Sequence, residues 1–171
     1  MEHDAAVTDG LIGDPLIARR PRPAVNRVEV LYRAHRVRLT RLACAITLDR
    51  SLAEEVVQDA FAGLNRHGQH VSNPEGYLQR SVVNLSIKLL RRRSVAARHQ
   101  LDPAPVTSIP ELDETWNVVK ELPPRQRAVI VLRYWNDLSE EDIAQTLGWP
   151  KGTVKSTLHR ALDHLRKGLT P

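Results

Sequence analysis

Apolar residues recur at three- and four-residue spacings along most of the chain, the pattern of helices that bury one face. The first such face comprises Val28, Leu31, Tyr32, His35, Leu39, Leu42, Ala43 and Ile46. A second helix is expected to start after Asp49 or Ser51, either of which could cap it, and to bury Leu52, Val56, Val57, Ala60, Phe61 and Leu64. A third is predicted from Pro74 to about Arg93, with an apolar stripe of Leu78, Val82, Leu85 and Leu89.

A second series of helices is predicted beyond residue 110. One runs from Glu111 to Leu122 and ends at two prolines, and the next carries Val129, Ile130, Leu132 and Tyr134 to a turn at Asn136-Asp137. Ser139 and the acids after it form a capping-box pattern, and Gly148 is free to adopt the left-handed conformation that ends a helix. The last helix turns Val154, Leu158, Ala161, Leu162 and Leu165 inward. This arrangement predicts a helix-turn-helix.

The predicted fold class is therefore all-α, with two small helical domains at residues 26–93 and 111–171. Residues 94–110 contain Pro103, Pro105 and Pro110 and are predicted to be a flexible linker. Residues 1–25, rich in glycine and proline, are predicted to be a disordered extension without an assigned role. Trp116, Trp135 and Trp149 are expected to pack in the core of the second domain.

The charge of the chain predicts the class of its binding partner. The 171 residues include 25 Lys and Arg against 20 Asp and Glu, a formal charge of +5. No acid occurs from Arg80 to Leu101, so this stretch should attract a polyanion; a solvated basic helix end is the alternative interpretation. One cysteine, Cys44, and dispersed histidines predict neither a metal site nor a cofactor. The absence of a membrane-length apolar run and of a signal peptide predicts a cytoplasmic location.

Two helical faces carry the chemistry expected of a DNA-binding protein. On the third helix, basic and amide side chains recur at intervals of four, four and three, with one more cation beside them: Arg80, Asn84, Lys88, Arg91 and Arg92. On the last helix, polar residues gather in the half that a helix-turn-helix inserts into the major groove: Lys151, Thr153, Lys155, Ser156, His159 and Arg160. The outer face of the second helix is acidic and is either solvated or a partner surface: Glu54, Glu55, Gln58 and Asp59.

At this point the sequence resembles the extracytoplasmic-function group of bacterial sigma-70-type factors, from about Val28 to Leu169. LPPRQRAVIVLRYWNDLSEEDIAQTLGWPKGTVKSTLHRALDHLRKGL, from Leu122 to Leu169, resembles region four of that family. DRSLAEEVVQDAF, from Asp49 to Phe61, is similar to its polymerase-binding helix, and YLQRSVVN, from Tyr77 to Asn84, to its promoter-melting helix.

The resemblance implies a binding subunit of RNA polymerase without a catalytic site of its own. It implies that the acidic face meets the clamp of the polymerase's largest subunits, that the row around Asn84 contacts the −10 element, and that the last helix reads the −35 element. The loop from about Arg66 to Asn73 would receive a base extruded from the non-template strand, and the linker would thread the polymerase cleft. An anti-sigma protein that clamps both regions is a further implied partner.

The chain departs from the family pattern at two places, Lys88, where an acid is common, and the segment GLNRHG, where a tryptophan is common. Both bear on −10 specificity and leave room for an alternative, a helix-turn-helix regulator that binds DNA or polymerase without melting the promoter. A response-regulator protein is a second alternative. It would require a receiver domain of alternating strands and helices, whereas residues 28–93 show helical spacing with a basic stripe.

Overall fold

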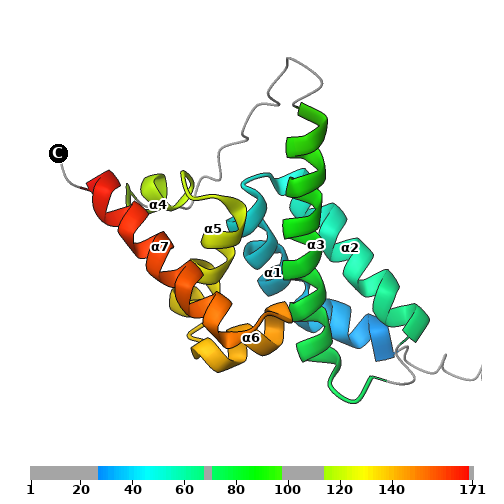
Figure 1. Ribbon diagram of the computed structural model, residues 1–171. Helices are drawn as coiled ribbons and strands as arrows, with labels where there is room; N and C mark the ends of the chain where they lie inside the picture. Colours follow the sequence, from blue (N-terminus) through cyan, green and yellow to red (C-terminus); the bar gives the residue numbers. More distant parts are fainter. Residues whose placement is uncertain (1–26, 68–70, 98–113, 170–171) are drawn as a thin grey trace, which may run out of the picture.

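In the computed structural model the chain forms two groups of helices that pack against each other (Figure 1). The structure describes residues 27–67, 71–97 and 114–169. Every regular element in these three ranges is helical, which confirms the all-α class expected from the spacing of apolar residues. The extension at 1–25 and the linker prediction beyond Ala97 lie outside the described residues.

The first unit consists of α1 (Arg27–Thr47), α2 (Arg50–His67) and α3 (Pro74–Ala97), each packed against the other two. Asp49 rather than Ser51 caps α2, since its Oδ1 accepts a hydrogen bond of 3.0 Å from the Leu52 amide. Helix α3 starts at Pro74 as expected but continues past Arg93 to Ala97. The added residues include two alanines and no helix breaker, so nothing local ends the helix at Arg93.

The second unit comprises α4 (Glu114–Val119), α5 (Pro124–Ile130), the π-helical turn η2 (Val131–Trp135), α6 (Glu140–Leu147) and α7 (Lys151–Leu169). Helix α7 packs against α4, α5 and α6. The capping box at the start of α6 is confirmed: Ser139 Oγ accepts from the Asp142 amide, and the Asp142 carboxylate accepts from the Ser139 amide. Gly148 has φ of 67°, the left-handed conformation predicted for it. Helices α6 and α7 therefore form the expected helix-turn-helix.

Three aromatic residues are more exposed than their sequence positions suggested. Tyr134 and Trp135 are 63% and 60% exposed, because the backbone widens at η2, where the Asn136 amide bonds the Val131 carbonyl five residues back. That extra residue in the turn moves the apolar stripe out of the register extrapolated from α5. Tyr32 is 38% exposed and contacts Phe61 edge to face. Trp116 is buried as predicted, and Trp149 is half-buried.

The two units share an interface. Helix α3 contacts α5 and α6, and α1 contacts α5 and η2. Buried side chains of both units form one contiguous cluster, whose members include Ile46 and Val82 from the first unit and Val129 and Ile143 from the second. Figure 1 shows α5 and α6 lying beside α1 and α3. The helices that carry the predicted DNA-binding residues are thus held on one compact body.

Candidate nucleic-acid interface

Helix α3 presents the basic row predicted for it. The side chains of Leu78, Val82 and Val83 anchor the helix in the first unit, which turns the cations outward. Four of the five predicted residues are exposed, Arg80, Lys88, Arg91 and Arg92, whereas Asn84 is half-buried. None of the four exposed cations forms a salt bridge with another described residue, so their charge is free to act on an external anion.

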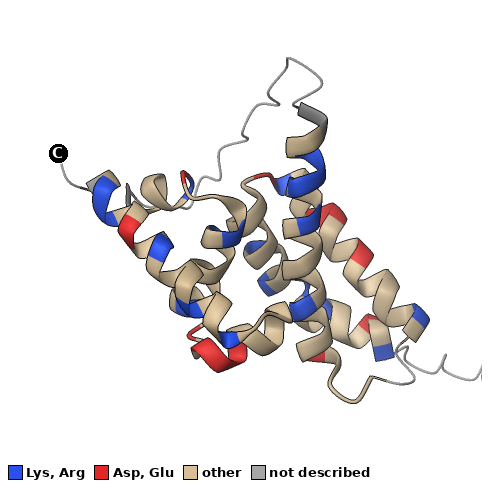
Figure 2. Cartoon of the chain, in the orientation of Figure 1, with Lys and Arg blue, Asp and Glu red and all other residues tan. Residues whose placement is uncertain are grey.

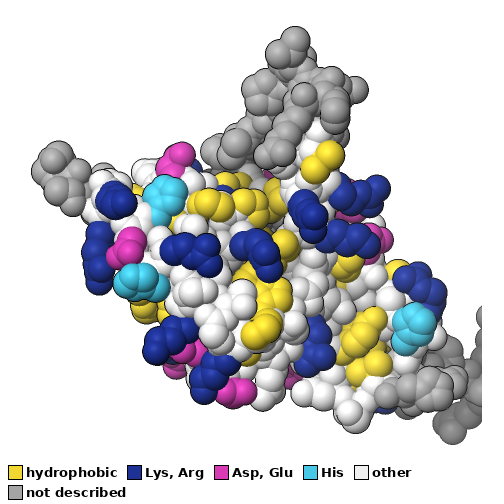
Figure 3. All heavy atoms as spheres, viewed as in Figure 1, with side chains coloured by type: hydrophobic (Ala, Val, Ile, Leu, Met, Phe, Trp, Pro, Cys, Tyr) yellow, Lys and Arg dark blue, Asp and Glu magenta, His cyan; other side chains and the backbone are white. Residues whose placement is uncertain are grey.

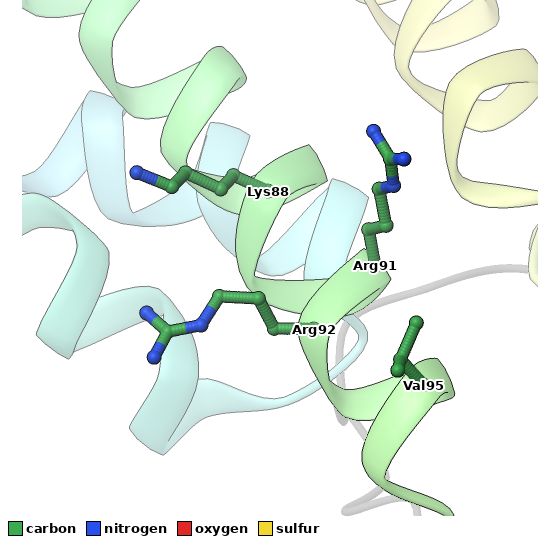
Figure 4. Close-up of a pocket in the computed structure, with 4 residues that line it drawn as sticks. All are labelled: Lys88, Arg91, Arg92 and Val95. Atoms are coloured by element: carbon green, nitrogen blue, oxygen red, sulfur yellow. The ribbon is translucent and has the colours of Figure 1, made fainter. Parts of the chain in front are cut away.

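An open hollow of about 460 Å³ lies at the carboxyl-terminal part of α3. It is lined by Lys88, Arg91, Arg92 and Val95, three cations and one apolar residue. Figure 4 shows Lys88 and Arg92 extending to one side of the helix, while Arg91 extends toward the side of the second unit. Positive groups spread around a helix in this way suit an extended phosphate backbone.

The outward face of α7 is equally polar. Val154, Thr157, Leu158 and Ala161 are buried against the rest of the second unit. Five of the six predicted residues are exposed on the opposite face, Lys151, Lys155, Ser156, His159 and Arg160, and Thr153 is half-buried. Figure 2 marks the basic positions along α3 and α7, and Figure 3 shows Lys and Arg side chains over both helices on one face of the molecule.

Local contacts hold several of these α7 side chains. Lys151 Nζ lies 2.9 Å from the Glu141 carboxylate, and this hydrogen bond with the acid's charge raises the pKa of Lys151. His159 Nε2 lies 3.3 Å from the Asp163 carboxylate. Arg160 donates through Nε to the Ser156 carbonyl at 3.1 Å, which lays its guanidinium along the helix. The face is therefore pre-arranged, with part of its charge balanced by neighbouring acids.

Arg125 is a candidate that the sequence reasoning did not identify. This exposed residue of α5 places its guanidinium 4.2 Å from the ring centroid of Trp149, in the turn that leads into α7. A cation–π contact of this kind fixes a long side chain next to the amino-terminal end of α7. The only signal in the sequence was the motif LPPRQR itself, because Arg125 and Trp149 are far apart along the chain.

The acidic residues of α2 face solvent. Glu54, Glu55, Gln58 and Asp59 are all exposed, while Val56, Val57, Ala60 and Phe61 are buried against α1 and α3. Glu54 pairs with Arg50 at 3.0 Å. The loop predicted from about Arg66 to Asn73 starts later than expected, because Arg66 and His67 belong to the last turn of α2. Gly68 to His70 lie outside the described residues. Asn73 Oδ1 accepts from the Gly76 amide and so caps α3.

Other functional groups are few among the described residues. No cluster of three or more His, Cys, Asp and Glu side chains there could hold a metal ion. Cys44 is half-buried against the core, and burial raises the pKa of its thiol. None of the helices in the described ranges combines the length and apolarity needed to cross a bilayer.

Comparison with protein families assigns both units. Residues 31–95 match the family model for sigma-70 region 2, and residues 112–165 match the model for sigma-70 region 4. The chain belongs to the sigma-70 family of RNA polymerase sigma factors. These proteins serve transcription initiation and are not enzymes. The order of the two matched regions agrees with the resemblance found in the motifs.

Curated relatives place this sigma factor in the extracytoplasmic-function (ECF) group. It is 33% identical over 160 residues to the RNA polymerase sigma-E factor of Streptomyces coelicolor, covering 85% of this chain and 87% of the relative. It is 30% identical over 153 residues to the ECF RNA polymerase sigma factor SigL of Mycobacterium tuberculosis, covering 81% of this chain and 86% of the relative. The family resemblance inferred from the motifs is confirmed.

Two solved structures share the fold. One is the sigma factor RpoE of Bartonella quintana in complex with the anti-sigma factor NepR, with a TM-score of 0.63, 22% identity, and coverage of 81% of this chain and 94% of that chain. The other is CnrH in complex with the cytosolic domain of CnrY, with a TM-score of 0.57, 23% identity, and coverage of 83% and 86%.

Proposed function

We propose that this sigma factor acts by binding alone: it joins core RNA polymerase in the bacterial cytoplasm, contacts promoter DNA at two elements, and helps to open it. The observation that carries this proposal is the pair of outward basic faces on α3 and α7, one in each matched region. In this scheme residues 26–93 form one functional domain and residues 111–171 the other, and residues 94–110 connect them.

Helix α7 would read the −35 element as duplex DNA. An α-helix fits the major groove, and the predicted residues that are exposed on α7 lie in the amino-terminal half of the helix, the half that would enter the groove. Lys155 and Arg160 have the reach and charge for phosphates or guanine edges, while Thr153 and Ser156 suit phosphates or several bases. Arg125, held against Trp149, would add a phosphate contact beside the turn.

Helix α3 would contact the −10 element and stabilise the separated strands. Its exposed cations would neutralise phosphates and release counterions, which favours binding most strongly at low salt. Asn84, half-buried among them, offers an amide that both donates and accepts hydrogen bonds. The separated strands would then be stabilised by one helix that carries both cations for the phosphates and an amide for the bases.

The exposed acids of α2 would bind the clamp of the largest polymerase subunits. Glu54, Glu55, Gln58 and Asp59 share one solvent-facing side of the helix and suit a basic partner surface. An anti-sigma protein is proposed as a further partner. Both solved structures described above are complexes, and the partner of RpoE, NepR, is named an anti-sigma factor.

Transcription in vitro with core polymerase tests this function. The double variant Asn84→Ala, Arg91→Ala should reduce open-complex formation about tenfold or more, because it removes an amide and a charge from the −10 surface. It should still bind core polymerase and a −35 duplex. Permanganate reactivity of unpaired thymines measures the opening directly.

The matched control is Arg33→Ala, a change at an exposed arginine of α1 that pairs with Glu29. This control should support transcription as the parent protein does. If the double variant opens the promoter as well as the parent protein does, the assignment of Asn84 and Arg91 to the −10 surface is wrong. If the parent protein binds DNA or polymerase but leaves thymines unreactive to permanganate, the alternative of a regulator that does not melt DNA is favoured. If the parent protein starts no transcript from any cognate promoter, the proposed function is wrong.

A further inference from the structure

A single buried arginine connects the two units. Arg127 of α5 is 5% exposed. Its Nε donates to the carbonyl of Ile46, near the end of α1, at 2.9 Å. Its Nη1 donates to the carbonyls of Lys120 and Leu122, in the segment after α4, at 2.8 Å and 3.2 Å. The same guanidinium therefore binds a turn of its own unit and a helix end of the other.

Helix polarity explains why an arginine is stable in this place. The last carbonyls of a helix lack amide partners and carry partial negative charge. Helix α1 has no basic residue in its last turn, so Arg127 supplies from the second unit the cation that α1 does not provide. Burial lowers the pKa of Arg127 to about 10, which leaves the side chain charged at neutral pH.

The contact around Arg127 is a packed interface. Four consecutive residues of α5, from Arg127 to Ile130, are buried. Successive residues of a helix point about 100° apart, so four buried in a row mean that the last turn of α5 is covered on all sides. Helix α7 covers α5 from within the second unit, and α1 and α3 cover it from the first.

In this arrangement the outward faces of α3 and α7 are too close together to contact both promoter elements at once. Their names place the elements about 25 base pairs apart, which is about 85 Å of duplex at about 3.4 Å per base pair. Helix α3 has 24 residues and is about 36 Å long, and it contacts α6, whose turn leads directly into α7. With these helices in contact, the outward faces of α3 and α7 lie much closer together than the two elements.

We propose that Arg127 is the latch of this closed arrangement: its bond to the Ile46 carbonyl holds α5 and α6 against α1 and α3, and both elements can be engaged only after that bond breaks. That the two units must separate rests on the proposed function. The closed form and its latch are properties of the free protein and do not depend on that function. Breaking the latch should favour the open form by a factor on the order of ten or more, as expected for a hydrogen bond to a charged group.

Distances between two spin labels on the free full-length protein test the closed form. Ala62→Cys on α2 and Lys167→Cys on α7, in a Cys44→Ala background, provide exposed sites on helices outside the main contacts between the units. The parent protein should show one narrow distance distribution. A broad distribution of long distances in the parent would overturn the closed form, whatever any variant does.

Arg127→Lys separates the bond between units from the bonds within the second unit. Lysine keeps the charge and has a terminal donor for the local carbonyls, but it has a methylene where Arg127 Nε donates to Ile46. Arg133→Lys is the matched control, since Arg133 also donates to a carbonyl, that of Leu138, but within one unit. Arg127→Ala removes all three bonds, and circular dichroism reports whether each variant keeps its helices.

The latch predicts that Arg127→Lys gains a long-distance population that the parent and Arg133→Lys lack, with helicity unchanged. An unchanged narrow distribution in a folded Arg127→Lys protein would overturn the role of Arg127. Affinity for core polymerase is measured separately and should rise several-fold in Arg127→Lys, because less of the protein must first open. If no variant binds polymerase while the distances change as expected, the proposed function fails and the latch stands.

Discussion

At the scale of single residues, the outward face of α7 combines cations with acids that hold them in place. Lys151 pairs with Glu141 across the helix-turn-helix, and His159 pairs with Asp163 one turn away. These side chains are exposed, so solvent screens the pairs and they contribute little to stability. The pairs should instead weaken DNA binding, because the neighbouring acid offsets part of the cation's attraction for a phosphate.

Glu141→Gln should therefore increase affinity for −35 duplex DNA. The change leaves Lys151 charged at neutral pH, because removing the acid only returns its raised pKa toward the ordinary value of 10.5. Binding should tighten about two- to fivefold at low salt, and the plot of log affinity against log salt should become steeper by up to about 0.9. Fluorescence anisotropy over a salt series measures both quantities.

Glu29→Gln is the control for this experiment, because Glu29 also pairs with a cation at an exposed helix position but lies on α1. It should leave both the affinity and the slope unchanged. An equal gain in the two variants would mean that net charge, rather than release of Lys151, strengthens binding.

At the scale of elements, the short helix α6 depends on its ends. It has eight residues, too few for a stable isolated helix, so caps and packing must hold it. The reciprocal bonds between Ser139 and Asp142 satisfy its first amides, and Gly148 ends it in a left-handed conformation. Ile143, Ala144 and Leu147 then bury its inner side. Because α6 leads directly into α7, these caps set the direction of α7.

Ser139→Ala should lower the free energy of unfolding by about 1 kcal/mol, the usual cost of losing a serine N-cap. Ser51→Ala is the matched control, since Ser51 stands at the start of α2 but Asp49 provides that cap. The control should change stability by less than about 0.5 kcal/mol. Urea titrations followed by circular dichroism measure both, and equal losses would show that the Ser139 cap contributes nothing specific.

At the scale of the whole molecule, the closed arrangement joins two sets of helices into one buried cluster. A cluster shared across an interface couples the stability of the two units, because neither can unfold without exposing apolar surface of the other. Sequence alone describes two modules on a linker, whereas the packed structure behaves as one body.

The parent protein should consequently unfold in one transition. All three tryptophans, Trp116, Trp135 and Trp149, lie in the second unit, so fluorescence follows that unit while circular dichroism follows the helices of both. The two probes should give the same urea midpoint. Clearly separated midpoints in the parent protein would contradict the coupling, and Arg127→Lys should move the midpoints apart.

Much of the helical framework and of the exposed basic surface followed from the sequence by itself. Helix faces, the start of α3 at Pro74, the capping box and Gly148 all depend on residues within a few positions of one another. The outward direction of Lys88, Arg91, Lys155 and Arg160 follows from the same local periodicity. Chemistry carried by neighbouring residues of one helix can be read directly from their spacing.

Only the tertiary structure decided how these helices meet. The exposure of Tyr134 and Trp135 depends on a π-helical turn that the apolar pattern did not show. The approach of Arg125 to Trp149, and the bond from Arg127 to the Ile46 carbonyl 81 residues away, depend on the path of the chain. Local periodicity determines which side of a helix is apolar, but the partner that covers it is selected by packing among distant segments, because burial is non-directional and carries no record of sequence separation.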